Sequence, residues 1–134
     1  MTDTQPAGTA EGLDIVIRCG AIVLSARLDA SPCARDVAAA LPVDSEAGRF
    51  GGELFFEIPV NSRLAEDARQ TVLAGDIAYW PPGRAFCIFW GPTPVGNEGE
   101  IRAASRVNII GRVTGDPTIL SAIREGEIIR VEKA

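Results

Sequence analysis

The chain has 134 residues, of which 46% are hydrophobic and 23% charged, so its size and composition are those of one globular domain. A formal net charge of −5 excludes the basic surface that nucleic acids and anionic membranes require of a partner. Histidine is absent, which excludes a Ser-His-Asp or Cys-His nucleophile, a His-ligated zinc and a histidine pH switch.

The first predicted elements are a tail and a β-hairpin. Residues 1–12 are rich in Thr, Ala, Gly and Pro, which predicts a disordered tail, and the domain itself is expected at residues 13–134. In residues 13–19 and 21–28 every second position is apolar, a pattern typical of half-buried strands. Gly20 stands between them and predicts a short turn.

One helix is predicted next. Ser31 supplies an N-cap hydroxyl, and Pro32 occupies the first helical position, where its missing N–H has no cost. The alanine-rich run that follows ends at Leu41-Pro42, because proline cannot continue a helix. We expect this helix to cover one end or side of a sheet.

Residues 53–58 predict a strand with two unlike faces. The residues of one parity are apolar and are expected in the core: Leu54, Phe56 and Ile58. The residues of the other parity share the outward face: Glu53, Phe55 and Glu57. Two carboxylates flanking an aromatic ring are either a solvated face with arginine partners or the acidic edge of a groove. Residues 62–73 show weak helical spacing and predict a short turn or helix.

The stretch at residues 75–94 predicts a strand, a rigid turn and a second strand. Residues 76–80 alternate and end at Pro81, and Pro82-Gly83 is a turn signal. Residues 85–90 are apolar at every position, so both faces of that strand must be covered or used. One parity would fill the core and the other would line a groove on the outer wall, and a helix covering the second face is the alternative.

Four side chains around this turn are candidate ligand contacts. Tyr79 and Trp80, stiffened by the two prolines, would form a preorganised wall. Phe86 would line the groove. Arg84 is the cation nearest to this wall, and it is either a solvated charge or the partner of a ligand carboxylate or carbonyl.

The C-terminal part predicts further strands. Residues 101–104 form a short strand or connection, residues 106–114 a strand with a bulge or bend at Gly111, and residues 127–131 a last strand after one helical turn at 118–124. Asn108 is expected to bond backbone groups rather than a ligand. Seven or eight strands with one or two helices indicate a sandwich or a barrel, and a closed barrel is preferred because it leaves no sheet edges.

The cysteines and the terminus bear on location. Cys19, Cys33 and Cys87 are far apart in the sequence and form no CxxC motif, which predicts buried free thiols in a reducing cytosol and neither metal nor cofactor. Neither a signal peptide nor a membrane-length apolar run is visible. We therefore expect a soluble cytoplasmic protein.

Four segments together resemble the bacterial and archaeal cyclophilin-like proteins, over roughly residues 13–132. They are Glu-Leu-Phe-Phe-Glu-Ile-Pro-Val at 53–60, Gly-Asp-Ile-Ala-Tyr-Trp-Pro-Pro-Gly-Arg-Ala at 75–85, Phe-Trp-Gly-Pro-Thr-Pro at 89–94 and Asn-Ile-Ile-Gly-Arg-Val at 108–113. The resemblance implies a mainly β fold, the closed eight-stranded antiparallel cyclophilin barrel, with one or two short helices.

The same resemblance bears on catalysis. True cyclophilins carry a Phe-His-Arg strand and a Gln-Gly-Gly-Asp segment, and here the similar strand is Phe55-Phe56-Glu57. Glu57 would stand where the arginine should, and an anion cannot donate a hydrogen bond to a proline nitrogen. Whether the protein is an enzyme stays open.

The leading hypothesis is a binding module that holds a small molecule or peptide segment in an apolar groove. Its candidate ligand-binding residues are Glu53, Phe55, Glu57, Tyr79, Trp80, Arg84 and Phe86. A weak peptidyl-prolyl isomerase and an accessory subunit of an amide- or urea-derivative hydrolase are the alternatives. A homodimer or a partner subunit is also open.

Overall fold

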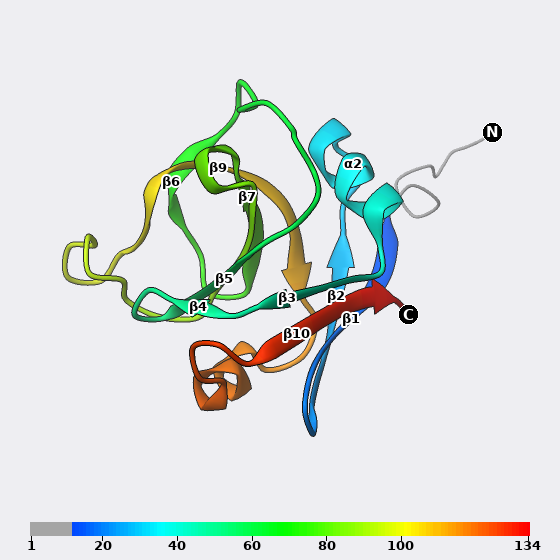
Figure 1. Ribbon diagram of the computed structural model, residues 1–134. Helices are drawn as coiled ribbons and strands as arrows, with labels where there is room; N and C mark the ends of the chain where they lie inside the picture. Colours follow the sequence, from blue (N-terminus) through cyan, green and yellow to red (C-terminus); the bar gives the residue numbers. More distant parts are fainter. Residues whose placement is uncertain (1–11) are drawn as a thin grey trace.

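The computed structural model describes residues 12–134 and is built on one ten-stranded antiparallel sheet (Figure 1). The tail predicted for residues 1–12 lies outside the described residues, apart from Gly12. The strands are β1 Leu13–Cys19, β2 Ile22–Leu28, β3 Val43–Glu46, β4 Gly48–Arg49, β5 Glu53–Glu57, β6 Arg69–Val72, β7 Asp76–Trp80, β8 Ala85–Phe89, β9 Ile101–Val113 and β10 Ile128–Lys133. The helices are α2 Pro32–Ala40 and the 3₁₀ turns η1 Pro81–Gly83 and η2 Pro117–Ala122.

The order of strands confirms the mainly β, antiparallel fold but not the closed eight-stranded barrel. Hydrogen bonding runs β3-β10-β1-β2-β9-β7-β8-β5-β4, with β6 on β9, so the path has two ends. Only Ala47 separates β3 from β4. β3 pairs with β10 and β4 pairs with β5. The two end strands of the path therefore follow each other in the chain but are not hydrogen-bonded to each other in a ladder. The strand count is higher than expected because β3, β4 and β6, which are short and carry little apolar pattern, were not predicted.

The N-terminal half follows its sequence pattern closely. β1 and β2 pair along their whole length, and Gly20 takes a φ of 58° in the turn, where glycine is favoured. The Ser31 hydroxyl accepts a hydrogen bond from Ala34 N at 3.3 Å, and Pro32 begins α2 as predicted. The helix buries Cys33, Ala34 and Val37 against the sheet.

Two predictions in the second half of the chain are wrong. Residues 69–72, expected within a turn or helix, form strand β6. The short strand or connection expected at 101–104 and the strand expected at 106–114 are one 13-residue strand, β9. The N-terminal half of β9 pairs with β6, and the C-terminal half pairs with β7 and β2. β6 is polar at most positions, so its extended conformation comes from this pairing and not from its own residue pattern.

A bulge beside Gly111 accompanies this change of partner, as expected. The register shifts between Ile77 and Ala78, which oppose Gly111 and Ile109. A Cβ at Gly111 would lie 2.2 Å from the Arg27 carbonyl oxygen, so the close approach of β2 requires glycine here.

Strand β8 is buried on both faces. Phe86 and Ile88 belong to the main core, where the Phe86 ring stacks on Phe56 with centroids 5.1 Å apart. The other face belongs to a second apolar cluster: Val72, Ala78, Ala85, Cys87, Phe89, Ala103 and Val107. Strands β6 and β9, and not a helix, therefore cover the outer face of β7 and β8. In Figure 1, β6 and α2 lie on opposite sides of the molecule.

Candidate functional site

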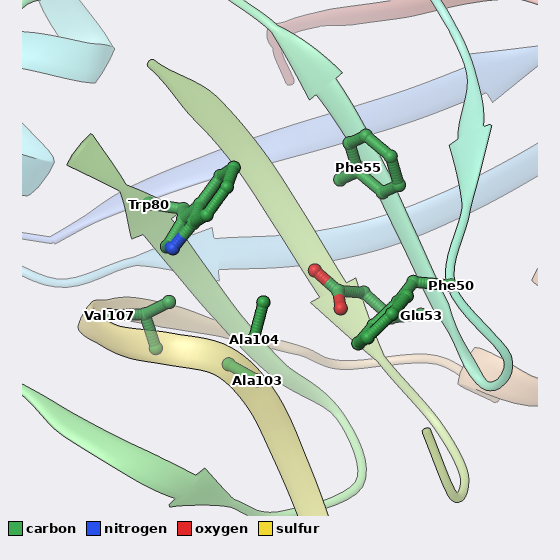
Figure 2. A pocket seen from close by; sticks show the side chains of 7 residues that line it. All are labelled: Phe50, Glu53, Phe55, Trp80, Ala103, Ala104 and Val107. Carbon is green, nitrogen blue, oxygen red and sulfur yellow. The ribbon is translucent and has the colours of Figure 1, made fainter. Parts of the chain in front are cut away.

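A pocket of about 220 Å³ lies where β9 passes over β5 and the end of β7. Figure 2 shows its seven lining side chains: Phe50, Glu53, Phe55, Trp80, Ala103, Ala104 and Val107. Phe50 comes from the turn between β4 and β5, and the others come from β5, β7 and β9. Six of the seven are apolar or aromatic, so the carboxyl group of Glu53 is the single ionisable group of the lining.

Alternation along β5 directs two side chains into this pocket. Glu53 and Phe55 share one face, and Leu54 and Phe56 are buried in the main core on the other. Across the pocket, β9 contributes Ala103 and Ala104, whose small side chains leave space that larger residues would fill.

A glycine lies against each of two aromatic side chains of the lining, Phe55 and Trp80. The Phe55 ring lies against Gly48, where an added Cβ would be 2.6 Å from Cζ of the ring. The Trp80 indole lies against Gly83, where an added Cβ would be 2.8 Å from the ring. The indole Nε1–H also donates to Ser105 Oγ at 2.7 Å, which fixes its orientation.

Glu53 is buried with only 5% of its surface exposed. Burial raises the pKa of Glu53 to about 7, and hydrogen bonding with the Cys87 thiol opposes the shift. Burial also raises the pKa of Cys87, as does the neighbouring Glu53 charge. Among residues 12–134, no cationic side chain forms an ion pair with Glu53. A carboxyl group that changes charge near neutral pH therefore faces an apolar pocket.

A family model described as cyclophilin-like matches residues 13–132. The chain belongs to the cyclophilin-like family. The solution structure of the hypothetical protein AF2241 from Archaeoglobus fulgidus is similar to this chain, with a TM-score of 0.79 and 35% identity. The match covers 96% of this chain and 98% of that one. No curated protein matches the chain.

The cyclophilin-like fold brings together three of the seven residues predicted from the sequence: Glu53, Phe55 and Trp80. Tyr79 and Phe86, predicted as ligand contacts, do not line the pocket, because both side chains face the main core. They have the opposite parity from Trp80 and Cys87 on their strands. The Tyr79 hydroxyl donates to Val60 O at 2.6 Å and accepts from Ser62 N at 3.1 Å, so it is a buried core group.

Glu57 and Arg84, also predicted as ligand contacts, do not line the pocket either. Their side chains pair with each other at 3.1 Å and are 64% and 53% exposed, outside the pocket lining. This is the solvated outer face that was the alternative interpretation of both residues. An exposed pair of this kind contributes little to stability.

Four lining residues were not predicted from the sequence: Phe50, Ala103, Ala104 and Val107. Phe50 precedes Gly51-Gly52, and an aromatic residue before a glycine pair carries no signal for a pocket. The three β9 residues reach the site only because β9 folds over β5 and β7, a pairing that local periodicity does not contain.

Other predicted groups have structural roles. Asn108 accepts from Ala65 N at 2.7 Å and donates to Arg63 O at 2.8 Å, which confirms its backbone-bonding role. The three cysteines are free and buried. Within residues 12–134, no group of His, Cys, Asp and Glu side chains is arranged to hold a metal ion. In the same residues, no helix has the length and apolarity needed to cross a bilayer.

Proposed function

We propose that this cyclophilin-like protein is a binding module that holds a small molecule in the pocket between β5, β7 and β9. The observation that carries the proposal is a preformed cavity with aromatic walls and a single ionisable group. Ligand sites in proteins are typically concave, mostly apolar and fitted with a few polar groups that orient the ligand.

The volume supports a small ligand. A cavity of about 150 Å³ can accommodate benzene, and this pocket measures about 220 Å³. A peptide segment, the other ligand predicted from the sequence, would need a long groove beside β8. The outer face of β8 is buried, and β6 and β9 contribute to the cluster that covers it.

The lining favours binding over prolyl isomerisation. An isomerase of the cyclophilin type needs a cation that reaches the proline nitrogen, and the seven lining residues include no Arg or Lys. Arg84, the candidate cation, is paired with Glu57. The isomerase and the hydrolase-subunit alternatives stay predictions from the resemblance, and the homodimer stays open.

A fragment titration followed by NMR tests this proposal. Benzene-sized apolar compounds should shift the Trp80 indole N–H and the Ala103 and Ala104 methyl resonances in a saturable manner. Ala104→Phe should abolish these shifts, because Ala104 is an exposed residue of the lining and the larger ring would fill the cavity. Ala39→Phe, on the exposed side of α2, is the matched control and should bind normally. Saturable binding that Ala104→Phe leaves unchanged would contradict the proposal.

A further inference from the structure

Three aromatic rings and one carboxyl group line the same small pocket. Figure 2 shows the Glu53 carboxyl directed into the space between Phe55, Trp80 and β9, with the Phe50 ring beside it. The faces of aromatic rings carry negative potential and attract cations, and aromatic cages bind alkylated ammonium groups in this way. We infer that the ligand is a small organic cation, an ammonium group with an apolar body; this inference rests on the proposed function.

The burial of Glu53 supports a cationic ligand. Taking a carboxylate out of water is costly unless a partner charge or hydrogen bonds compensate. Glu53 is only 5% exposed, and no Arg or Lys of residues 12–134 forms an ion pair with it. A bound ammonium group would provide the missing countercharge, and the apolar walls would cover the remainder of the ligand.

The hydrogen-bond donors of the lining argue against an anionic ligand. The Trp80 Nε1–H is the one side-chain N–H among the seven lining residues, and Ser105 Oγ already accepts it. An anion would find no free side-chain donor there and would be repelled by Glu53. The net charge of −5 acts in the same direction, because it attracts cations to the molecule.

A metal ion fits the pocket poorly. Calcium takes six to eight oxygen ligands and magnesium requires an octahedral shell, whereas the lining offers the carboxyl of Glu53 alone. Aromatic rings cannot replace the lost hydration shell of such an ion. An alkylammonium group is weakly hydrated by comparison and exposes CH groups that pack on ring faces.

The protonation of Glu53 gives the inference a signed pH dependence. Besides burial, the Cys87 thiol of β8 influences the pKa of Glu53. The residues that face the pocket from β7 and β9 are not titratable. With a pKa of about 7, Glu53 is ionised in about one molecule in ten at pH 6 and about nine in ten at pH 8. A cation selects the ionised form, so its affinity should rise about tenfold between these pH values. A neutral ligand that accepts a hydrogen bond from protonated Glu53 would show the opposite trend.

A pair of matched probes tests this inference on the full chain. Choline and 3,3-dimethylbutan-1-ol have the same shape, and only choline is charged. Calorimetry and NMR titration should show that choline binds more tightly than the alcohol at pH 8 and weakens about tenfold at pH 6. The affinity of the alcohol should not rise between pH 6 and pH 8.

Two variants separate the charge of Glu53 from other causes. Glu53→Gln should lose the preference for choline and its pH dependence, and Glu57→Gln, an exposed carboxylate on the same strand, should retain both. If Glu53→Gln fails to fold, the pH series on the unmodified chain decides the question. Equal binding of the two probes would overturn the inference and leave the proposed function intact. Failure of these probes and of the apolar fragments alike would overturn both.

Discussion

Glu53 and Glu57 project from the same face of β5, yet Glu53 is 5% exposed and the Glu57 side chain is 64% exposed. The Glu53 end of the strand lies under β9, where the pocket forms. The Glu57 end is open to solvent and pairs with Arg84. The two glutamates on β5 therefore differ in exposure because β9 covers only the part of that face that carries Glu53.

The burial of Glu53 should make stability depend on pH. Its pKa is about 7 in the folded chain against 4.5 as the ordinary value, so between these pH values the folded state holds a proton that the unfolded state has released. Stability should therefore fall as pH rises from 4.5 to 7, by up to about 3 kcal/mol. Urea denaturation at pH 5 and pH 8 should show this fall in the unmodified chain and a smaller one in Glu53→Gln. Equal pH dependence in the two proteins would contradict the assignment.

Gly48 should matter to the pocket more than to the fold. In Gly48→Ala the new methyl group would displace the Phe55 ring, which is the end of a flexible side chain and can move. We expect a stability loss of about 1 kcal/mol and a clear loss of ligand affinity. Gly91→Ala is the control, since an added Cβ there lies 3.9 Å from its nearest neighbour, an ordinary contact. Thermal unfolding and fragment titration of both variants measure the two effects. Unchanged affinity in Gly48→Ala would contradict the role of Gly48 in positioning the Phe55 ring.

Tyr79→Phe should affect stability and leave binding unchanged. The variant leaves the Val60 carbonyl and the Ser62 N–H without the partner they have at the buried hydroxyl. Such losses cost about 1–3 kcal/mol. Chemical denaturation measures the cost, and a fragment titration at a temperature where the variant is folded should give the affinity of the unmodified chain. A large affinity change would place Tyr79 back in the site.

The backbone conformation of Arg84 should lower the stability of the chain. It takes a φ of 47° and a ψ of 47°, a left-handed conformation that glycine adopts more readily than arginine. Arg84→Gly should raise stability by up to about 1 kcal/mol, less the small contribution of the exposed pair with Glu57. Arg84→Ala should remove the pair without relieving the backbone, so it should be less stable than Arg84→Gly. Neither variant should change ligand affinity, and the reverse order of stability would contradict this account.

The parts of the fold that could be predicted are those encoded locally. Alternation gave the faces of β1, β2 and β5, and a hydroxyl followed by proline gave the start of α2. The continuous apolar pattern of β8 correctly indicated that both of its faces are covered or used, but the groove expected along its outer face is absent, because that face is buried against β6 and β9. The nature of the cover could not be predicted, because β6 and β9 come from distant segments whose pairing depends on the whole sheet.

The candidate site divides in the same way. Parity correctly put Glu53 and Phe55 on one face of β5. Tyr79 and Phe86 were assigned to the site because parity on β7 and β8 could not be tied to a particular side. Ala103 and Ala104 carry no chemical signal, and their contribution is the space that they leave. A pocket made of small residues on one strand and large residues on another is visible only when the strands are placed in space.

The most direct test of small-molecule binding is the measurement of intermolecular nuclear Overhauser effects between a bound apolar fragment and the labelled protein. We expect contacts from the fragment to the Ala104 and Val107 methyl groups and to the Trp80 ring, all lost in Ala104→Phe. A fragment that binds saturably but contacts only residues outside the pocket would contradict this expectation.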